Sequence, residues 1–120
     1  MIGAERVDFV AIPVTDKDRA LAFYGETLGL ELESEGEHDM EFRCGQVTLD
    51  VFDPSSIGQE FAPSPAGLAL RVPDVEVARA ELEAKGVVFD GETIKTSVCK
   101  QAWFKDPDGN ALMLHRRFDA

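Results

Sequence analysis

The chain has 120 residues, of which 44% are hydrophobic and 29% are charged, and its formal net charge at pH 7 is −11. This composition is typical of one compact globular domain, and no apolar run approaches the roughly 18 residues that a membrane span requires. The excess of acidic residues disfavours nucleic acids and membranes as partners. Because the N-terminus lacks the basic and apolar regions of a signal peptide, we expect a cytoplasmic protein.

A strand and a helix are predicted near the start of the chain. Apolar residues alternate along residues 10–14, which indicates a strand with one buried face. Asp16 follows at a position where its carboxylate can cap the first turn of a helix. Apolar and small side chains then recur at helical spacing as far as Gly29, which suits a left-handed helix cap. The extended stretches 29–35, 39–45 and 47–53 complete a βαβββ order.

The second half of the chain repeats this pattern. Identical residues recur 58 positions apart, namely Val14 and Val72, Asp16 and Asp74, and Ala20 and Ala78. The repeat predicts a strand at residues 68–72, a helix that Asp74 caps and Gly86 ends, and extended stretches at 86–92, 96–106 and 111–118. The sequence DPDGN at 106–110 is a strong turn signal between the last two of these strands.

We therefore expect an α+β fold in which two tandem βαβββ modules form curved mixed sheets around a cleft. Module one covers about residues 5–54, and module two covers about residues 67–118. Residues of about 55–66 are rich in Pro, Ser and Gly and have no period, which predicts a linker. Both modules would belong to a single domain, 1–120.

The repeat, the sequence AFYGETLGL at 22–30 and the late DPDGN together resemble the vicinal-oxygen-chelate superfamily, which includes glyoxalases, bleomycin resistance proteins and extradiol dioxygenases. The resemblance covers almost the whole chain. In metal-dependent members it implies four ligands, one on the first and one on the last strand of each module. These positions hold Phe9, Asp50, Gly67 and Met113 here. Only Asp50 offers a donor, and catalytic metals need about three protein ligands, so we expect no metal and no other cofactor.

Strand alternation predicts which residues share a face with these four positions. The expected ligand-binding residues are Phe9, Asp50, Phe52, Arg71, Trp103, Met113 and His115, with Arg71 and His115 near the rim. Trp103 faces the cleft if Phe104 packs inward. Aromatic walls around one carboxylate favour a flat or cationic organic molecule through stacking and cation–π attraction.

The favoured hypothesis is a metal-free, homodimeric protein that binds a small molecule and sequesters an aromatic or cationic antibiotic or metabolite. The alternative is a lyase, isomerase or dioxygenase-like enzyme that uses Asp50 as general base, or as part of a non-standard metal site with His115. A regulatory module whose ligand is a metabolite is a third hypothesis. In a fourth, the same side chains only fill a dimer or inter-module core.

Overall fold

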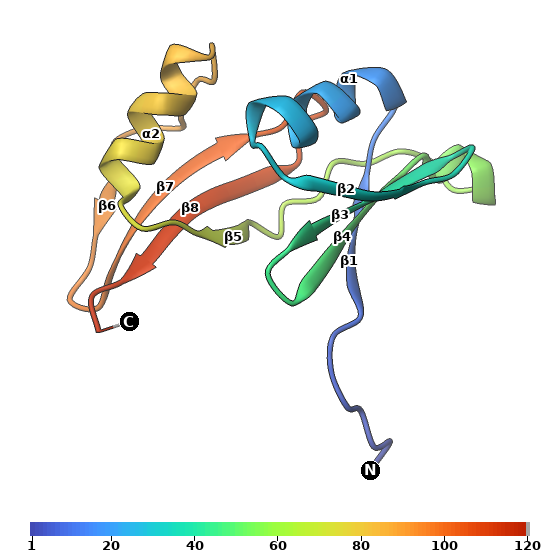
Figure 1. Cartoon of the computed structure of the whole chain (residues 1–120), viewed down its shortest axis with the longest axis horizontal. Helices are drawn as coiled ribbons and strands as arrows, with labels where there is room; N and C mark the ends of the chain where they lie inside the picture. Colours follow the sequence, from blue (N-terminus) through green and yellow to red (C-terminus); the bar gives the residue numbers. More distant parts are fainter. Residues whose placement is uncertain (120) are drawn as a thin grey trace. The chain divides into compact units, whose positions relative to one another are not determined.

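The computed structural model describes residues 1–119, which form two compact units, one of residues Met1–Ala62 and one that begins at Pro63. Each unit contains one four-stranded mixed sheet and one main helix (Figure 1). The predicted α+β fold of two similar modules is thus confirmed. The predicted domain limit at residue 120 lies outside the described residues, and the union of both units in a single domain stays a prediction.

Unit one follows the predicted βαβββ order. Its elements are β1 (Phe9–Pro13), α1 (Lys17–Leu21), the π-helical turn η1 (Ala22–Thr27), β2 (Glu31–Glu35), β3 (Asp39–Cys44), β4 (Val47–Phe52) and the 3-10 turn η2 (Pro54–Ile57). The strand order in the sheet is β1-β4-β3-β2. Strand β1 runs parallel to β4, and the other neighbouring strands are antiparallel.

Unit two has the same topology. Its elements are β5 (Leu68–Arg71), α2 (Val75–Ala84), β6 (Ile94–Lys95), β7 (Cys99–Lys105) and β8 (Ala111–Arg117). The strand order is β5-β8-β7-β6, again with the first strand parallel to the last and the other pairs antiparallel. Both predicted helix caps are confirmed, because Asp16 accepts from the Arg19 N–H and Asp74 from the Val77 N–H, each at 3.0 Å.

The core of each unit lies between its helix and one face of its sheet. In unit one this face is formed by Met40, Phe42, Leu49 and Val51, and in unit two by Ala102, Phe104, Leu112 and Leu114, all of them at most 3% exposed. The Tyr24 ring packs against Phe42 with 5.9 Å between the ring centroids. The predicted strand alternation is therefore confirmed, and it leaves the opposite face of each sheet, here called the distal face, to the residues in between.

The first helix differs from the prediction in its second half. It begins as an α-helix after Asp16, but from Ala22 it widens into a π-turn, in which the Leu28 N–H donates to the Phe23 carbonyl at 2.9 Å. The wider turn buries both Phe23 and Tyr24. Apolar spacing marks the helix and its end before Gly29, but it does not distinguish these two hydrogen-bond patterns.

The prediction of a strand at residues 86–92 is wrong. This segment makes only an isolated bridge, from Phe89 to Phe104, and the short strand β6 forms later, at Ile94–Lys95. Arg79 holds the segment in a loop instead: its guanidinium lies 4.8 Å from the Phe89 ring centroid and donates to the Gly91 carbonyl at 2.9 Å. A contact from the helix thus replaces the strand pairing.

The turn at 106–110 is confirmed, and it also binds the end of the predicted linker. Asp106 is buried, and its Oδ1 accepts from the Asp108 and Asn110 N–H groups at 3.0 and 2.9 Å. The Ser64 N–H donates to Oδ1 of Asn110 at 2.7 Å. The segment around Ser64 is therefore part of unit two rather than a free connection.

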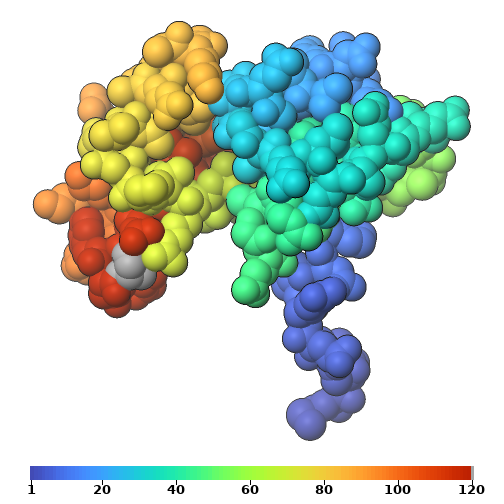
Figure 2. All heavy atoms as spheres, viewed as in Figure 1, coloured from blue at the N-terminus to red at the C-terminus, as the bar shows by residue number. Residues whose placement is uncertain are grey.

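The first residues of the chain extend from unit one. Residues 1–9 are all exposed, and Figure 2 shows the beginning of the chain, in dark blue, standing out from the body of its own unit. Within residues 1–119, no helix is long and apolar enough to cross a membrane.

Candidate functional site

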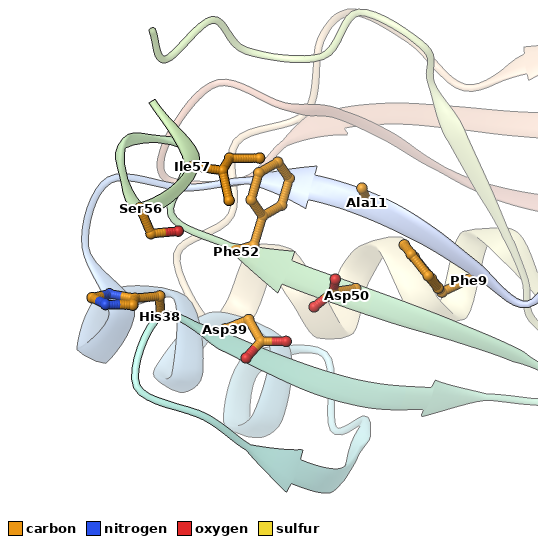
Figure 3. Close-up of a pocket in the computed structure, with 8 residues that line it drawn as sticks. All are labelled: Phe9, Ala11, His38, Asp39, Asp50, Phe52, Ser56 and Ile57. Carbon is orange, nitrogen blue, oxygen red and sulfur yellow. The ribbon is translucent and has the colours of Figure 1, made fainter. Parts of the chain in front are cut away.

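A pocket opens on the distal face of the sheet in unit one, and strand register determines what it contains. Ala11, Asp50 and Glu41 are direct neighbours on β1, β4 and β3; we call them the acidic row. Phe52 and Asp39 form the next row on the same face. The pocket has a volume of about 370 Å³, within the usual range for small-molecule sites. It is lined by Phe9, Ala11, His38, Asp39, Asp50, Phe52, Ser56 and Ile57 (Figure 3).

The walls of this pocket are apolar. Phe9 and Phe52 flank Asp50 along the sheet, and Ile57 comes from the turn η2 that follows β4 (Figure 3). Phe9 is 54% exposed and Ile57 is 64% exposed, so large apolar surface borders the opening. Between them, the single methyl group of Ala11 leaves space beside Asp50, where a larger side chain would fill the pocket.

Asp50 contributes a carboxyl group to the floor of the pocket. Its Oδ1 atom is buried and has no hydrogen-bond partner among residues 1–119. Burial, as the largest cause, and the nearby carboxyl groups of Asp39 and Glu41 together raise the pKa of Asp50 to about 6. Two carboxyl groups can share a hydrogen bond only when one of them is protonated, which is why Asp39 favours the protonated form of Asp50.

The distal face of unit two has a different composition. Its row equivalent to the acidic row contains Ala69, Met113 and Trp103, here called the tryptophan row. The Trp103 indole lies over Gly67: a Cβ atom placed on Gly67 would come within 2.5 Å of Cη2 of the ring. The indole N–H donates to Oε1 of Gln101 at 3.1 Å, which fixes the ring. Tryptophan therefore occupies the space that a side chain at position 67 would need.

The structure thus places the predicted site residues on two faces. Phe9, Asp50 and Phe52 line one pocket in unit one. Arg71, Trp103, Met113 and His115 share the distal face of unit two, where Arg71 pairs with His115 in strand register. Phe104 packs inward, as it is fully buried, so Trp103 lies on the distal face, and the expectation that it faces a ligand-binding cleft stays a prediction. A role of all seven residues in ligand binding stays a prediction.

Sequence reasoning did not include five of the pocket residues among the expected site residues, namely Ala11, His38, Asp39, Ser56 and Ile57. The alternation of Asp39 and Glu41 with the apolar Met40 and Phe42 carried the signal for Asp39, because it puts both acids on the face of Asp50. Ile57 and Ser56 carried no such signal, since they belong to a 3-10 turn in a segment without periodicity.

The residues at the four family ligand positions do not fit a metal centre. Phe9 and Gly67 have no donor atom, and the thioether of Met113 is a poor ligand for the hard and borderline divalent metals that bind nitrogen and oxygen. The space at Gly67 is also taken by the Trp103 ring. Elsewhere in residues 1–119, no three His, Cys, Asp or Glu side chains come together in a way that could hold a metal ion.

Comparisons with known proteins agree with the architecture. The model of the family described as Glyoxalase/Bleomycin resistance protein/Dioxygenase superfamily matches residues 6–114. The uncharacterized protein YaeR of Escherichia coli (strain K12) is 32% identical over 132 aligned residues, which cover 98% of this chain and 100% of that protein.

Two solved structures illustrate the range of functions among similar folds. TnmS3, an antibiotic binding protein from Streptomyces sp. CB03234, is 30% identical with a TM-score of 0.81, covering 98% of this chain and 99% of its own. A lactoylglutathione lyase from Agrobacterium tumefaciens is 22% identical with a TM-score of 0.80, covering 93% of each chain. The second likeness shows the fold alone. Binding proteins and enzymes are thus both found among the similar structures.

Proposed function

Because the chain belongs to the Glyoxalase/Bleomycin resistance protein/Dioxygenase superfamily, we propose that it is a metal-free binding protein that sequesters an aromatic or cationic small molecule in the unit-one pocket. One observation carries the proposal: a largely apolar pocket of about 370 Å³ contains Asp50, whose buried Oδ1 has no hydrogen-bond partner among residues 1–119. Such a site suits a ligand that is mostly apolar and that one polar contact orients.

The physical roles of the lining residues follow from their chemistry. Phe9 and Phe52 offer aromatic surface, and stacking or cation–π contacts contribute about 0.5–2 kcal/mol each. Asp50 would orient a cationic or donor group toward the floor. The antibiotic-binding relative TnmS3 supports binding as the function, and it does so at 30% identity over nearly the full length. Arg71, Trp103, Met113 and His115 remain proposed as further ligand contacts.

We also propose a homodimer, and residence in the cytoplasm stays part of the prediction. Val7, Phe9 and Ile57 are between 54% and 64% exposed, and apolar surface beside a pocket is often covered by a second copy. Light scattering at micromolar concentration should give twice the chain mass. The mass of a monomer would contradict this part of the proposal.

A second candidate function is catalysis with Asp50 as general base. The observation in its favour is the pKa of Asp50, which burial and the neighbouring carboxyl groups raise to about 6, close to the range that suits a base at neutral pH. In that case Asp50→Asn should abolish turnover and largely preserve substrate binding, because a base acts on the chemical step.

A titration panel tests the proposed function. Aromatic cations, neutral aromatic metabolites and antibiotics are screened by thermal shift, and each hit is measured by calorimetry against wild type and Asp50→Asn. We expect binding of one ligand per chain, with a loss of about 10-fold or more in Asp50→Asn for cations, the scale of a hydrogen bond to a charged group. A failure of every compound to bind, or consumption of a bound compound by the wild type, would reject the binding-protein proposal.

A further inference from the structure

The floor of the pocket contains two carboxyl groups rather than one. Asp50 on β4 and Asp39 on β3 both line the pocket from neighbouring strands (Figure 3), and Oδ1 of Asp39 lies beside Gly36. The strand partner of Asp50 is Glu41, so Asp39 is the diagonal neighbour, at a separation that side chains can bridge. A ligand group that reaches Asp50 therefore also meets Asp39.

Among the described residues that line the pocket, His38 is the only one with a basic side chain. The remaining lining residues are apolar, apart from Ser56 and His38, and the imidazole of His38 points away from Asp50 in Figure 3. Oδ1 of Asp50 is buried without a hydrogen-bond partner among the described residues. A buried acceptor of this kind needs a donor and not only a positive charge, because its lost hydrogen bonds to water must be replaced.

We propose that the ligand is an organic cation whose charged head donates at least two N–H bonds, one to Asp50 and one to Asp39, while its apolar part lies against Phe9 and Phe52. This inference rests on the proposed function and specifies its ligand class: primary ammonium, amidinium or guanidinium heads fit. A quaternary ammonium carries the same charge but no N–H, so it cannot donate a hydrogen bond to either carboxyl group. A neutral aromatic alcohol such as 2-phenylethanol lacks both the charge and the N–H donors.

The proposal also predicts proton release on binding. The charged groups that face Asp50 are Asp39 and Glu41 on β3, whereas the neighbours on β1, Phe9 and Ala11, carry no charge. Near pH 6 the carboxyl group of Asp50 is partly protonated, and a bound cation favours its ionised form, so the proton leaves to the buffer.

Calorimetric titration with three related probes tests the inference: phenethylamine, its N,N,N-trimethyl derivative and 2-phenylethanol. We expect phenethylamine to bind about 10-fold more tightly than the trimethyl derivative, on the scale of a charge-assisted hydrogen bond. In two buffers of different ionisation enthalpy near pH 6, the amine should release protons, and 2-phenylethanol should not.

Two matched variants identify the second carboxylate. Asp39→Asn should weaken the binding of phenethylamine by about 5- to 10-fold and leave the affinity for 2-phenylethanol unchanged. Glu41→Gln removes the same charge from the same strand and face, but Glu41 does not line the pocket, so the loss should be about 2-fold or less.

The outcomes separate this inference from the proposed function. The two-donor ligand would be overturned if the trimethyl derivative bound as tightly as phenethylamine, or if Asp39→Asn and Glu41→Gln weakened phenethylamine binding equally. The proposal of a binding protein would still stand in that case. If none of the three probes binds at millimolar concentration while a neutral compound of the wider panel binds, the ligand class is also wrong. If nothing in either set binds, the proposed function fails as well.

Discussion

Phe42 in unit one and Phe104 in unit two occupy the same place in their sheets. Phe42 pairs with Leu49 and Phe104 pairs with Leu112, and both aromatic side chains are fully buried toward the helix. On the distal faces the equivalent positions differ: the acidic row of unit one corresponds to the tryptophan row of unit two. The duplicated modules thus retain a common core, and their distal faces have separate chemistries.

This difference indicates where a ligand can enter. On the distal face of unit one, Ala11 leaves space beside a buried carboxylate. On that of unit two, Ala69 occupies the equivalent strand position, but the Trp103 ring occupies the space over Gly67. Equal core packing combined with unequal distal faces is expected when stability constrains both repeats and binding constrains only one.

The largest expected effect concerns the shared core. Phe42→Ala and Phe104→Ala should each lower the free energy of unfolding by about 3–5 kcal/mol, because each leaves a large cavity beneath a helix. Urea denaturation of both variants checks this. If one substitution costs less than half as much as the other, the two cores are not equivalent.

The contact between Trp103 and Gly67 is expected to have a smaller effect. Gly67 has φ +70°, so Gly67→Ala adds backbone strain as well as a clash with the ring. Gly45→Ala is the matched control, since φ there is +62° and a Cβ would meet no atom within 4 Å. Gly67→Ala should cost about 1–3 kcal/mol more than the control in urea denaturation. The extra cost of Gly67→Ala should disappear when both glycine variants also carry Trp103→Ala. If the extra cost persists, the contact between Trp103 and Gly67 is not its cause.

Ala11 and Ala69 allow a direct comparison of the two distal faces. They are equivalent, exposed residues on the edge strands β1 and β5. Ala11→Phe should fill the pocket and weaken ligand binding by about 10-fold, or roughly 1.4 kcal/mol, whereas Ala69→Phe should leave binding unchanged. Calorimetry with phenethylamine or the best hit of the panel measures both. Equal losses would mean that the ligand contacts both distal faces.

The smallest expected effect is a dependence of stability on pH. The pKa of Asp50 is raised to about 6 in the folded protein, above the value of about 3.9 for an unfolded chain, so the folded state binds the proton more tightly. Wild type should therefore lose stability relative to Asp50→Asn as the pH rises from about 4 to above 6. The difference should stay below about 1 kcal/mol, because the group is partly exposed and solvent screens it. A constant difference between pH 4 and 8, in urea denaturation, would contradict the raised pKa.

The sequence contained most of the fold, because period-two alternation and the internal repeat report directly on burial. Residues such as Leu49 and Leu112 are buried as their spacing predicts. The loop at 86–92 was mispredicted, since its apolar residues satisfy a strand pattern. Phe89 makes only an isolated bridge to Phe104 and also contacts Arg79 of the helix, and residue spacing does not encode these contacts.

The candidate site was only partly predictable for a similar reason. Alternation placed Asp50, Phe9 and Phe52 on one face, as observed. It could not show that the small size of Ala11 opens a pocket, or that the Trp103 ring lies on Gly67, because both depend on side-chain volume across neighbouring strands. The turn that brings Ile57 to the pocket also lacks any periodic signal.

A titration of the isotope-labelled protein with phenethylamine, followed through backbone amide shifts, tests the location of the site most directly. The largest shifts are expected at residues 9–11, 39–41 and 50–52, around the unit-one pocket. Smaller or no shifts are expected for Gly67, Trp103 and Met113. If the largest shifts fall on these three residues and the Asp50 amide does not move, the binding site is on unit two, and the assignment of the pocket to ligand binding is wrong.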